Sequence, residues 1–253
     1  VAVDKESGKV IDDYACPYCN AEITKRKSQR ATKTFFDAVT GQEITQAKQF
    51  PVWINYSVGK NRYEKAPEVA DLELIKTLET AAIPYWFPTN KIMKGDKTGE
   101  PLRIGITHMH HFYTKRNLWV LASLWFKSQK ASLKSPILFL NEQVVWGMSK
   151  LARYVPTHYS QVNQYLSGTL YIGSQVVEVT PDYILSNKIE NLKKVFKKIN
   201  SIQENIISTN SANNVSLESN TIDYIFTDPP FGNNLMYSEL NFLWESWHKV
   251  QTN

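Results

Sequence analysis

The strongest structural signal in the sequence is the run Ile222-Asp223-Tyr224-Ile225-Phe226-Thr227-Asp228-Pro229-Pro230-Phe231-Gly232. Its first five residues form a short, mostly apolar stretch, which is typical of a central parallel strand buried on both faces. After the loop, the segment from Met236 to Trp247 carries apolar residues at helical spacing, which predicts an amphipathic helix. A strand, a loop and a helix in this order predict an α/β fold. The loop then lies at the carboxyl end of the strand, where open α/β sheets bind their ligands.

The loop itself has groups suited to methyl transfer onto an amino nitrogen. An exocyclic amine of a base is a poor nucleophile, and acceptors for its N–H groups help it to become tetrahedral as it attacks. The Asp228 carboxylate is one such acceptor and the Pro229 carbonyl is a second, while Pro229 and Pro230 fix the backbone. Phe231 offers a flat face on which an extruded base can stack. We therefore predict that Asp228, Pro229, Pro230 and Phe231 are catalytic, the alternative being a merely rigid turn.

A specific resemblance supports this interpretation. The catalytic-loop region of large bacterial adenine-specific DNA methylases is similar to Thr227–Gly232 and to its continuation, Asn234-Leu235-Met236-Tyr237-Ser238-Glu239-Leu240-Asn241-Phe242-Leu243-Trp244-Glu245. The similarity is close over roughly residues 221 to 249 and looser at 167–172 and around the cysteines. It implies a Rossmann-like methyltransferase fold, S-adenosylmethionine as the methyl donor, DNA as the partner, and catalytic roles for Asp228, Pro229 and Phe231. The implied target is adenine N6, with cytosine N4 as the alternative; a restriction-system partner is left open.

The sequence departs from that family at the cofactor loop. Such enzymes hold the cofactor on a glycine-rich loop, typically Asp-Pro-Phe-x-Gly-x-Gly, whereas Gly147, Gly168 and Gly173 are isolated here. We therefore expect the cofactor-binding residues to lie outside this chain. The chain is then an internal fragment, and the residues up to about 220 are an insertion between the cofactor and catalytic motifs.

Cys16 and Cys19 are the only cysteines, and their Cys-x-x-Cys spacing is typical of half a zinc ribbon. We predict zinc as a second bound group. The histidines 108, 110 and 111 could supply the remaining ligands, but we favour a matching pair located before Val1. A redox dithiol and incidental cysteines are the alternatives, and the βαβ unit that a thioredoxin-like pair requires is absent from the pattern.

Basic and aromatic residues alternate at Lys150, Arg153 and Tyr154, a mixture that contacts phosphates and stacks on bases. We predict nucleic-acid binding there, with an ordinary amphipathic surface as the alternative. The three histidines are better explained as packing residues at the start of a helix. The net charge of +5 favours polyanionic partners only weakly.

The pattern divides the chain into four segments. Residues 1–60 form a zinc-ribbon-like β segment, 61–207 a mixed insertion that is a candidate target-recognition region, 208–220 a Ser- and Asn-rich linker, and 221–253 the catalytic strand, loop and helix. Within the insertion we expect helices at about 71–82, capped by Asp71, at 115–127, capped by Thr114, at 137–151 and at 185–199, and strands at 169–172 and 175–179. No apolar run could span a bilayer and no export signal is visible, so we expect no membrane partner and a cytoplasmic location.

Two other functions remain open. Methylation of RNA or of a protein glutamine uses related loops that usually begin with Asn instead of Asp. A zinc-ribbon module that binds nucleic acid without catalysis would use Asp228–Phe231 only as a turn, and salt-dependent DNA binding without methylation would favour it.

Overall fold

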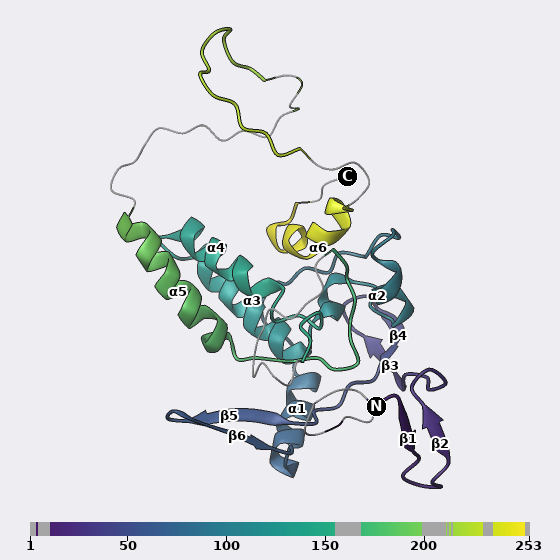
Figure 1. Ribbon diagram of the computed structural model, residues 1–253. Helices are drawn as coiled ribbons and strands as arrows, with labels where there is room; N and C mark the ends of the chain where they lie inside the picture. Colours follow the sequence, from purple (N-terminus) through teal and green to yellow (C-terminus); the bar gives the residue numbers. More distant parts are fainter. Residues whose placement is uncertain are drawn as a thin grey trace.

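The computed structural model describes residue 4 and residues 11–154, 168–198, 211, 213, 215–229 and 235–250. It is a mixed α and β structure in which helices form the body and short antiparallel hairpins lie beside it (Figure 1). The hairpins are β1 (Asp13–Ala15) with β2 (Glu22–Thr24), β3 (Thr32–Asp37) with β4 (Gln42–Ala47), and β5 (Ile54–Val58) with β6 (Asn61–Lys65). The helices are α1 (Val69–Thr80), α2 (Gly99–Arg103), the 3₁₀ helix η1 (Met109–Phe112), α3 (Lys115–Gln129), α4 (Lys134–Val145), α5 (Pro181–Lys198) and α6 (Tyr237–His248).

The hydrophobic core lies between α3, α4, α6 and η1. The Thr114 side chain accepts a hydrogen bond from the Asn117 N–H and begins α3, as predicted. The apolar stripe of α3, including Leu118 and Leu121, is buried. Because these residues recur at helical spacing, they all face the core.

Aromatic side chains attach α6 to this body. Trp247 packs against Trp125 of α3, with ring centroids 5.3 Å apart, and Trp244 stacks on Trp146 at 4.9 Å. The Trp247 indole N–H also donates to the Tyr113 hydroxyl, 3.4 Å away. The helix predicted after the Asp228 loop is therefore confirmed, and its apolar face is part of the core.

Two details of the helix predictions were wrong. Asp71 does not begin α1: the cap is Glu68, and the Asp71 carboxylate reaches back from the first turn to accept the Glu68 N–H at 2.9 Å. The stretch from 146 to 151 does not continue α4, because the chain turns there and the Ser149 hydroxyl donates to the Trp146 carbonyl.

The strands predicted at 169–172 and 175–179 are also absent. Leu170 and Ile172 are buried, but in irregular backbone packed against the helices. Within the described residues, the only sheet-like contact of this region is an isolated bridge between Arg153 and Val176. The apolar residues of this region are buried without a partner strand. A short apolar run is therefore not sufficient to predict a strand.

The strand predicted at Ile222–Phe226 is also absent, but here the apolar side chains are exposed instead of buried. The segment has irregular backbone and lies apart from the helices (Figure 1). Ile222, Tyr224, Ile225 and Phe226 are 51%, 80%, 75% and 80% exposed. A central parallel strand needs a neighbour on each side, but each strand of the described residues pairs within its own hairpin. A Rossmann-like sheet is therefore not present in the described part of the chain.

None of the helices in the described residues is both long and apolar enough to cross a membrane.

Candidate functional site

The predicted catalytic loop is only partly described. Asp228 and Pro229 are exposed and have irregular backbone, and Pro230 and Phe231 lie outside the described residues. The arrangement of the four groups around a base therefore stays a prediction.

The helix that follows this loop is held at its first turn by a backbone cradle. The Glu239 carboxylate of α6 accepts the backbone N–H groups of Asp96, Lys97 and Thr98 at 3.1, 2.8 and 3.1 Å. The cradle needs a glycine at position 95, because an added Cβ would overlap the Glu239 carboxylate. The Thr98 hydroxyl accepts the Gly95 N–H at 2.7 Å and fixes the turn. The start of α6 is therefore tied to a loop far away in the sequence.

Substitution of Glu239 by alanine should lower the free energy of unfolding by about 2 kcal/mol, because hydrogen bonds to a charged acceptor are stronger than neutral ones. Glu239→Gln should lose less, since its one carbonyl oxygen still accepts. The measurement is urea denaturation of the chain. Glu73→Ala, at an exposed position of α1, is the control and should change stability little. Equal effects of Glu239→Ala and Glu73→Ala would contradict the role of the cradle.

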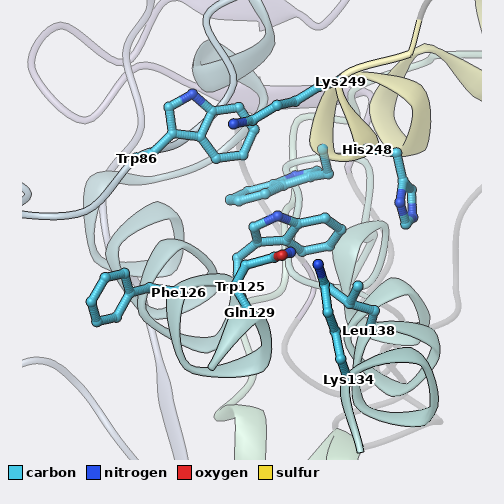
Figure 2. A pocket seen from close by; sticks show the side chains of 9 residues that line it. Trp86, Trp125, Phe126, Gln129, Lys134, Leu138, His248 and Lys249 are labelled. Atoms are coloured by element: carbon cyan, nitrogen blue, oxygen red, sulfur yellow. The ribbon is translucent and has the colours of Figure 1, made fainter. Parts of the chain in front are cut away.

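At its other end, α6 forms a wall of a pocket of about 400 Å³ (Figure 2). Trp125 and Trp247, which are buried, line it together with Trp86, which is 43% exposed. The Lys249 ammonium lies 4.3 Å from the centroid of the Trp86 ring, and Lys134 reaches in from α4. Flat apolar faces beside ammonium groups suit a planar ring that carries a negative charge. This pocket could not be predicted from the sequence, because its residues come from distant segments.

A second cluster joins the hairpin β3–β4 to the helical body. Asp37, the last residue of β3, lies with its Oδ2 atom 3.0 Å from His110 Nε2 and 3.2 Å from His111 Nε2. All three side chains are buried, and they offer one metal-ligand atom each within 4.8 Å of one another. His110 and His111, predicted as packing residues at the start of a helix, lie buried in η1, but the sequence did not indicate Asp37 as their partner. No spacing rule could have found it, since Asp37 is 73 residues from His110.

Burial and hydrogen bonding set the charges of this cluster. Burial alone would raise the pKa of Asp37, but hydrogen bonds from the Thr40 hydroxyl, from His110 and from the Val39 N–H hold that pKa well below its usual range. Burial lowers the pKa of His110, and burial together with the neighbouring His110 lowers the pKa of His111 to about 4. At neutral pH the cluster is therefore a carboxylate facing two uncharged imidazoles.

The metal-free chain should lose stability as the pH falls. The folded pKa of His111 lies below its usual value of 6.5, so the unfolded chain takes up the proton first. The contribution of the uncharged His111 to the free energy of unfolding is complete above pH 6.5 and decreases toward pH 4. At about 1.4 kcal/mol per pH unit, the free energy of unfolding falls by about 2 kcal/mol between pH 6.5 and 5. Asp37, His108, His110 and Lys150 are the charged or titratable neighbours in this range.

Urea denaturation at a series of pH values, with a chelator present, measures this dependence. His111→Gln should flatten it, whereas His248→Gln, which removes a histidine paired with Glu142, should not. An equally steep dependence in His111→Gln would contradict the assignment.

The two cysteines lie in a tight turn between β1 and β2. The Asn20 N–H donates to the Cys16 carbonyl at 2.9 Å, and Asn20 has a left-handed backbone with φ of 56°. Hydrogen bonds from the backbone N–H groups of Tyr18 and Cys19 lower the pKa of Cys16, which favours the thiolate that binds zinc. In the described part of the chain no carboxylate or histidine joins the cysteines in a metal-ligand cluster. His110 and His111 face Asp37 instead.

Lys150, Arg153 and Tyr154, the residues predicted to contact nucleic acid, are each half-buried. Burial, together with the nearby Lys33, lowers the pKa of Lys150 to about 8. The Lys150 N–H donates to the Phe112 carbonyl at 2.7 Å, so its backbone is part of the core packing. Nucleic-acid binding by these three residues stays a prediction.

Comparisons of the chain with protein-family models, with curated proteins and with solved structures found no match. Its function has to be inferred from its own residues.

Proposed function

We propose that this chain belongs to an S-adenosylmethionine-dependent DNA methyltransferase that modifies adenine N6, or less favourably cytosine N4. The observation that carries the proposal is the sequence Asp228-Pro229-Pro230-Phe231, followed by a helix, α6, that is anchored at both ends. An anchored helix fixes the point at which the loop ends. A loop that must hold a base at reacting distance needs such a support.

In the proposed reaction the chain positions the target base. The base is turned out of the duplex and stacks on Phe231. The Asp228 carboxylate and the Pro229 carbonyl accept the two N–H groups of the amine and orient its lone pair. S-adenosylmethionine, when bound, supplies a methyl group on a sulfonium leaving group. The chain has no glycine-rich loop to bind that cofactor, so the residues that hold it are not assigned here.

The exposed apolar segment before the loop is consistent with this proposal. Solvent exposure of Tyr224, Ile225 and Phe226 is unfavourable, at roughly 25 cal/mol per Å² of apolar surface. In a methyltransferase the same residues would be covered as a parallel strand between neighbours that the described residues do not provide. The pocket between Trp86, Trp125 and Lys249 offers stacking and cationic groups of the kind that bind nucleic acid.

The decisive experiment is methyl transfer by the complete natural protein that contains these residues. The protein is mixed with S-adenosylmethionine labelled in its methyl group and with DNA free of methylated bases, and the DNA is then hydrolysed to nucleosides. We expect the label in N6-methyl-2′-deoxyadenosine. Label in RNA or in a protein glutamine would replace the proposed substrate, and label in no acceptor would refute the methyltransferase.

The second candidate is a zinc-ribbon nucleic-acid-binding module without catalysis. The Cys16 turn favours it, because backbone N–H groups around that thiolate are what a zinc half-site requires. DNA binding that weakens with salt, in a protein that transfers no methyl group, would establish this module in place of the enzyme.

A further inference from the structure

The carboxylate of Asp37 carries more hydrogen bonds than its geometry favours. Its Oδ2 atom lies within hydrogen-bond distance of the Thr40 hydroxyl, His110 Nε2 and His111 Nε2, at 2.8, 3.0 and 3.2 Å. One carboxylate oxygen has about two lone-pair directions, so three donors crowd it. Oδ1 meanwhile accepts only the Val39 N–H at 3.0 Å. A cation in place of two N–H protons would relieve this crowding.

From this geometry we infer that Asp37, His110 and His111 form a binding site for a divalent transition-metal ion, with zinc as the best fit. Zinc bonds to imidazole nitrogen and carboxylate oxygen are about 2.0–2.2 Å long, which places tetrahedral ligands about 3.3–3.5 Å apart. The observed separations of 3.0 and 3.2 Å are close to that spacing. The Asp37 oxygen and each histidine nitrogen need to part by only a few tenths of an ångström to admit the ion.

The donor set is also chemically suited to zinc. Neutral imidazole together with one carboxylate selects zinc and its neighbours in the first transition row over magnesium or calcium, which prefer oxygen ligands. His111 Nδ1 accepts the Thr107 backbone N–H at 3.3 Å and also lies 3.3 Å from the Thr107 hydroxyl. When Nε2 binds the metal, Nδ1 carries the proton and donates it to that hydroxyl in place of accepting the N–H. The fourth position would be open to water or to His108, whose ring centroid is 5.4 Å from that of His111.

A second observation concerns His110. Its Nδ1 atom is buried and has no hydrogen-bond partner. A buried imidazole without a second partner is costly in the metal-free state. A metal at Nε2 would not supply that partner, because Nδ1 then carries the proton. The ligand role of His110 rests on its Nε2 atom, which lies beside the Asp37 carboxylate.

The site would have a structural role. Asp37 belongs to the hairpin β3–β4, whereas the histidines belong to η1, whose Met109 and Phe112 are fully buried in the core. A bound ion would therefore fasten the hairpin to the helical body. This site is separate from the two cysteines and does not depend on the methyltransferase proposal.

The test uses the Cys16→Ser/Cys19→Ser chain, so that the thiols cannot bind the metal. The purified chain is loaded with zinc, dialysed and analysed for metal content and thermal unfolding. We expect one equivalent of zinc and a higher unfolding temperature than in the metal-free chain. X-ray absorption should show only nitrogen and oxygen ligands, with the scattering pattern of two or three imidazoles. Absence of tightly bound zinc from this folded chain would overturn the inference.

Further substitutions in the same background locate the site. His111→Ala and Asp37→Asn should each remove the zinc and its effect on thermal unfolding, whereas His248→Ala should retain both. Circular dichroism of the metal-free variants establishes that they are folded. If His111→Ala is unfolded, Asp37→Asn, which preserves the size of the side chain, provides the test on its own. Zinc retained by a folded Asp37→Asn or His111→Ala chain would overturn the assignment.

Discussion

Substitution of Asp228 by alanine in the complete natural protein is expected to lower the rate constant of methyl transfer by about 10²–10³, the typical cost of removing one preorganised polar group at a reacting centre. The variant keeps the backbone of the loop and the Phe231 stacking face, so DNA affinity should change little. Loss of rate without loss of binding indicates an interaction made mainly in the transition state. Single-turnover measurements with saturating cofactor separate these two quantities.

Two variants sharpen this prediction. Asp223→Ala removes a carboxylate from the same exposed segment and should leave the rate unchanged. Asp228→Asn retains one acceptor oxygen and should keep more activity than Asp228→Ala. A normal rate in Asp228→Ala would mean that Asp228–Phe231 is only a turn.

Helices could be predicted from this sequence because their signals are local. Thr114 and the apolar stripe that follows it lie within a few turns of one another, and they define α3 whatever surrounds it. The face of α6 is equally local, since Leu243 and Trp247 are one helical turn apart. In both cases the periodicity identified the face toward the core, although Leu124, Leu240 and Trp244 on that face are only half-buried.

The strand at Ile222–Phe226 could not be predicted in the same way. A strand forms only when other strands accept its backbone hydrogen bonds, and an apolar run does not show whether they are present. In the described residues they are not, so the segment is exposed. The same limit explains 169–172, where the apolar residues are buried by helices instead.

The candidate sites show which chemistry a sequence can reveal. The loop at Asp228 and the cysteine pair are contiguous motifs and could be recognised directly. The ligand set of Asp37 with His110 and His111, and the cradle that binds Glu239, join residues 73 and more than 140 positions apart. Only the folded chain brings such groups together.

The folded chain itself should depend strongly on Trp247. This side chain is 1% exposed and packs against Trp125, while its indole N–H donates to the buried Tyr113 hydroxyl. Trp247→Ala should lower the free energy of unfolding by about 3–5 kcal/mol, because it leaves a large cavity and removes that donor. Urea denaturation followed by far-ultraviolet circular dichroism measures the loss.

Trp86→Ala is the matched control, because Trp86 meets the Trp247 ring edge-on, at 6.0 Å, but is 43% exposed. Trp86→Ala should lower the free energy of unfolding by about 1 kcal/mol, because the Trp86 side chain buries little apolar surface on folding. A Trp247→Ala chain as stable as Trp86→Ala would mean that α6 is not anchored through this ring. The anchor also bears on the proposed function: because α6 follows the predicted catalytic loop, its detachment frees the end of that loop. Trp247→Ala should then reduce methyl transfer by the complete protein as well.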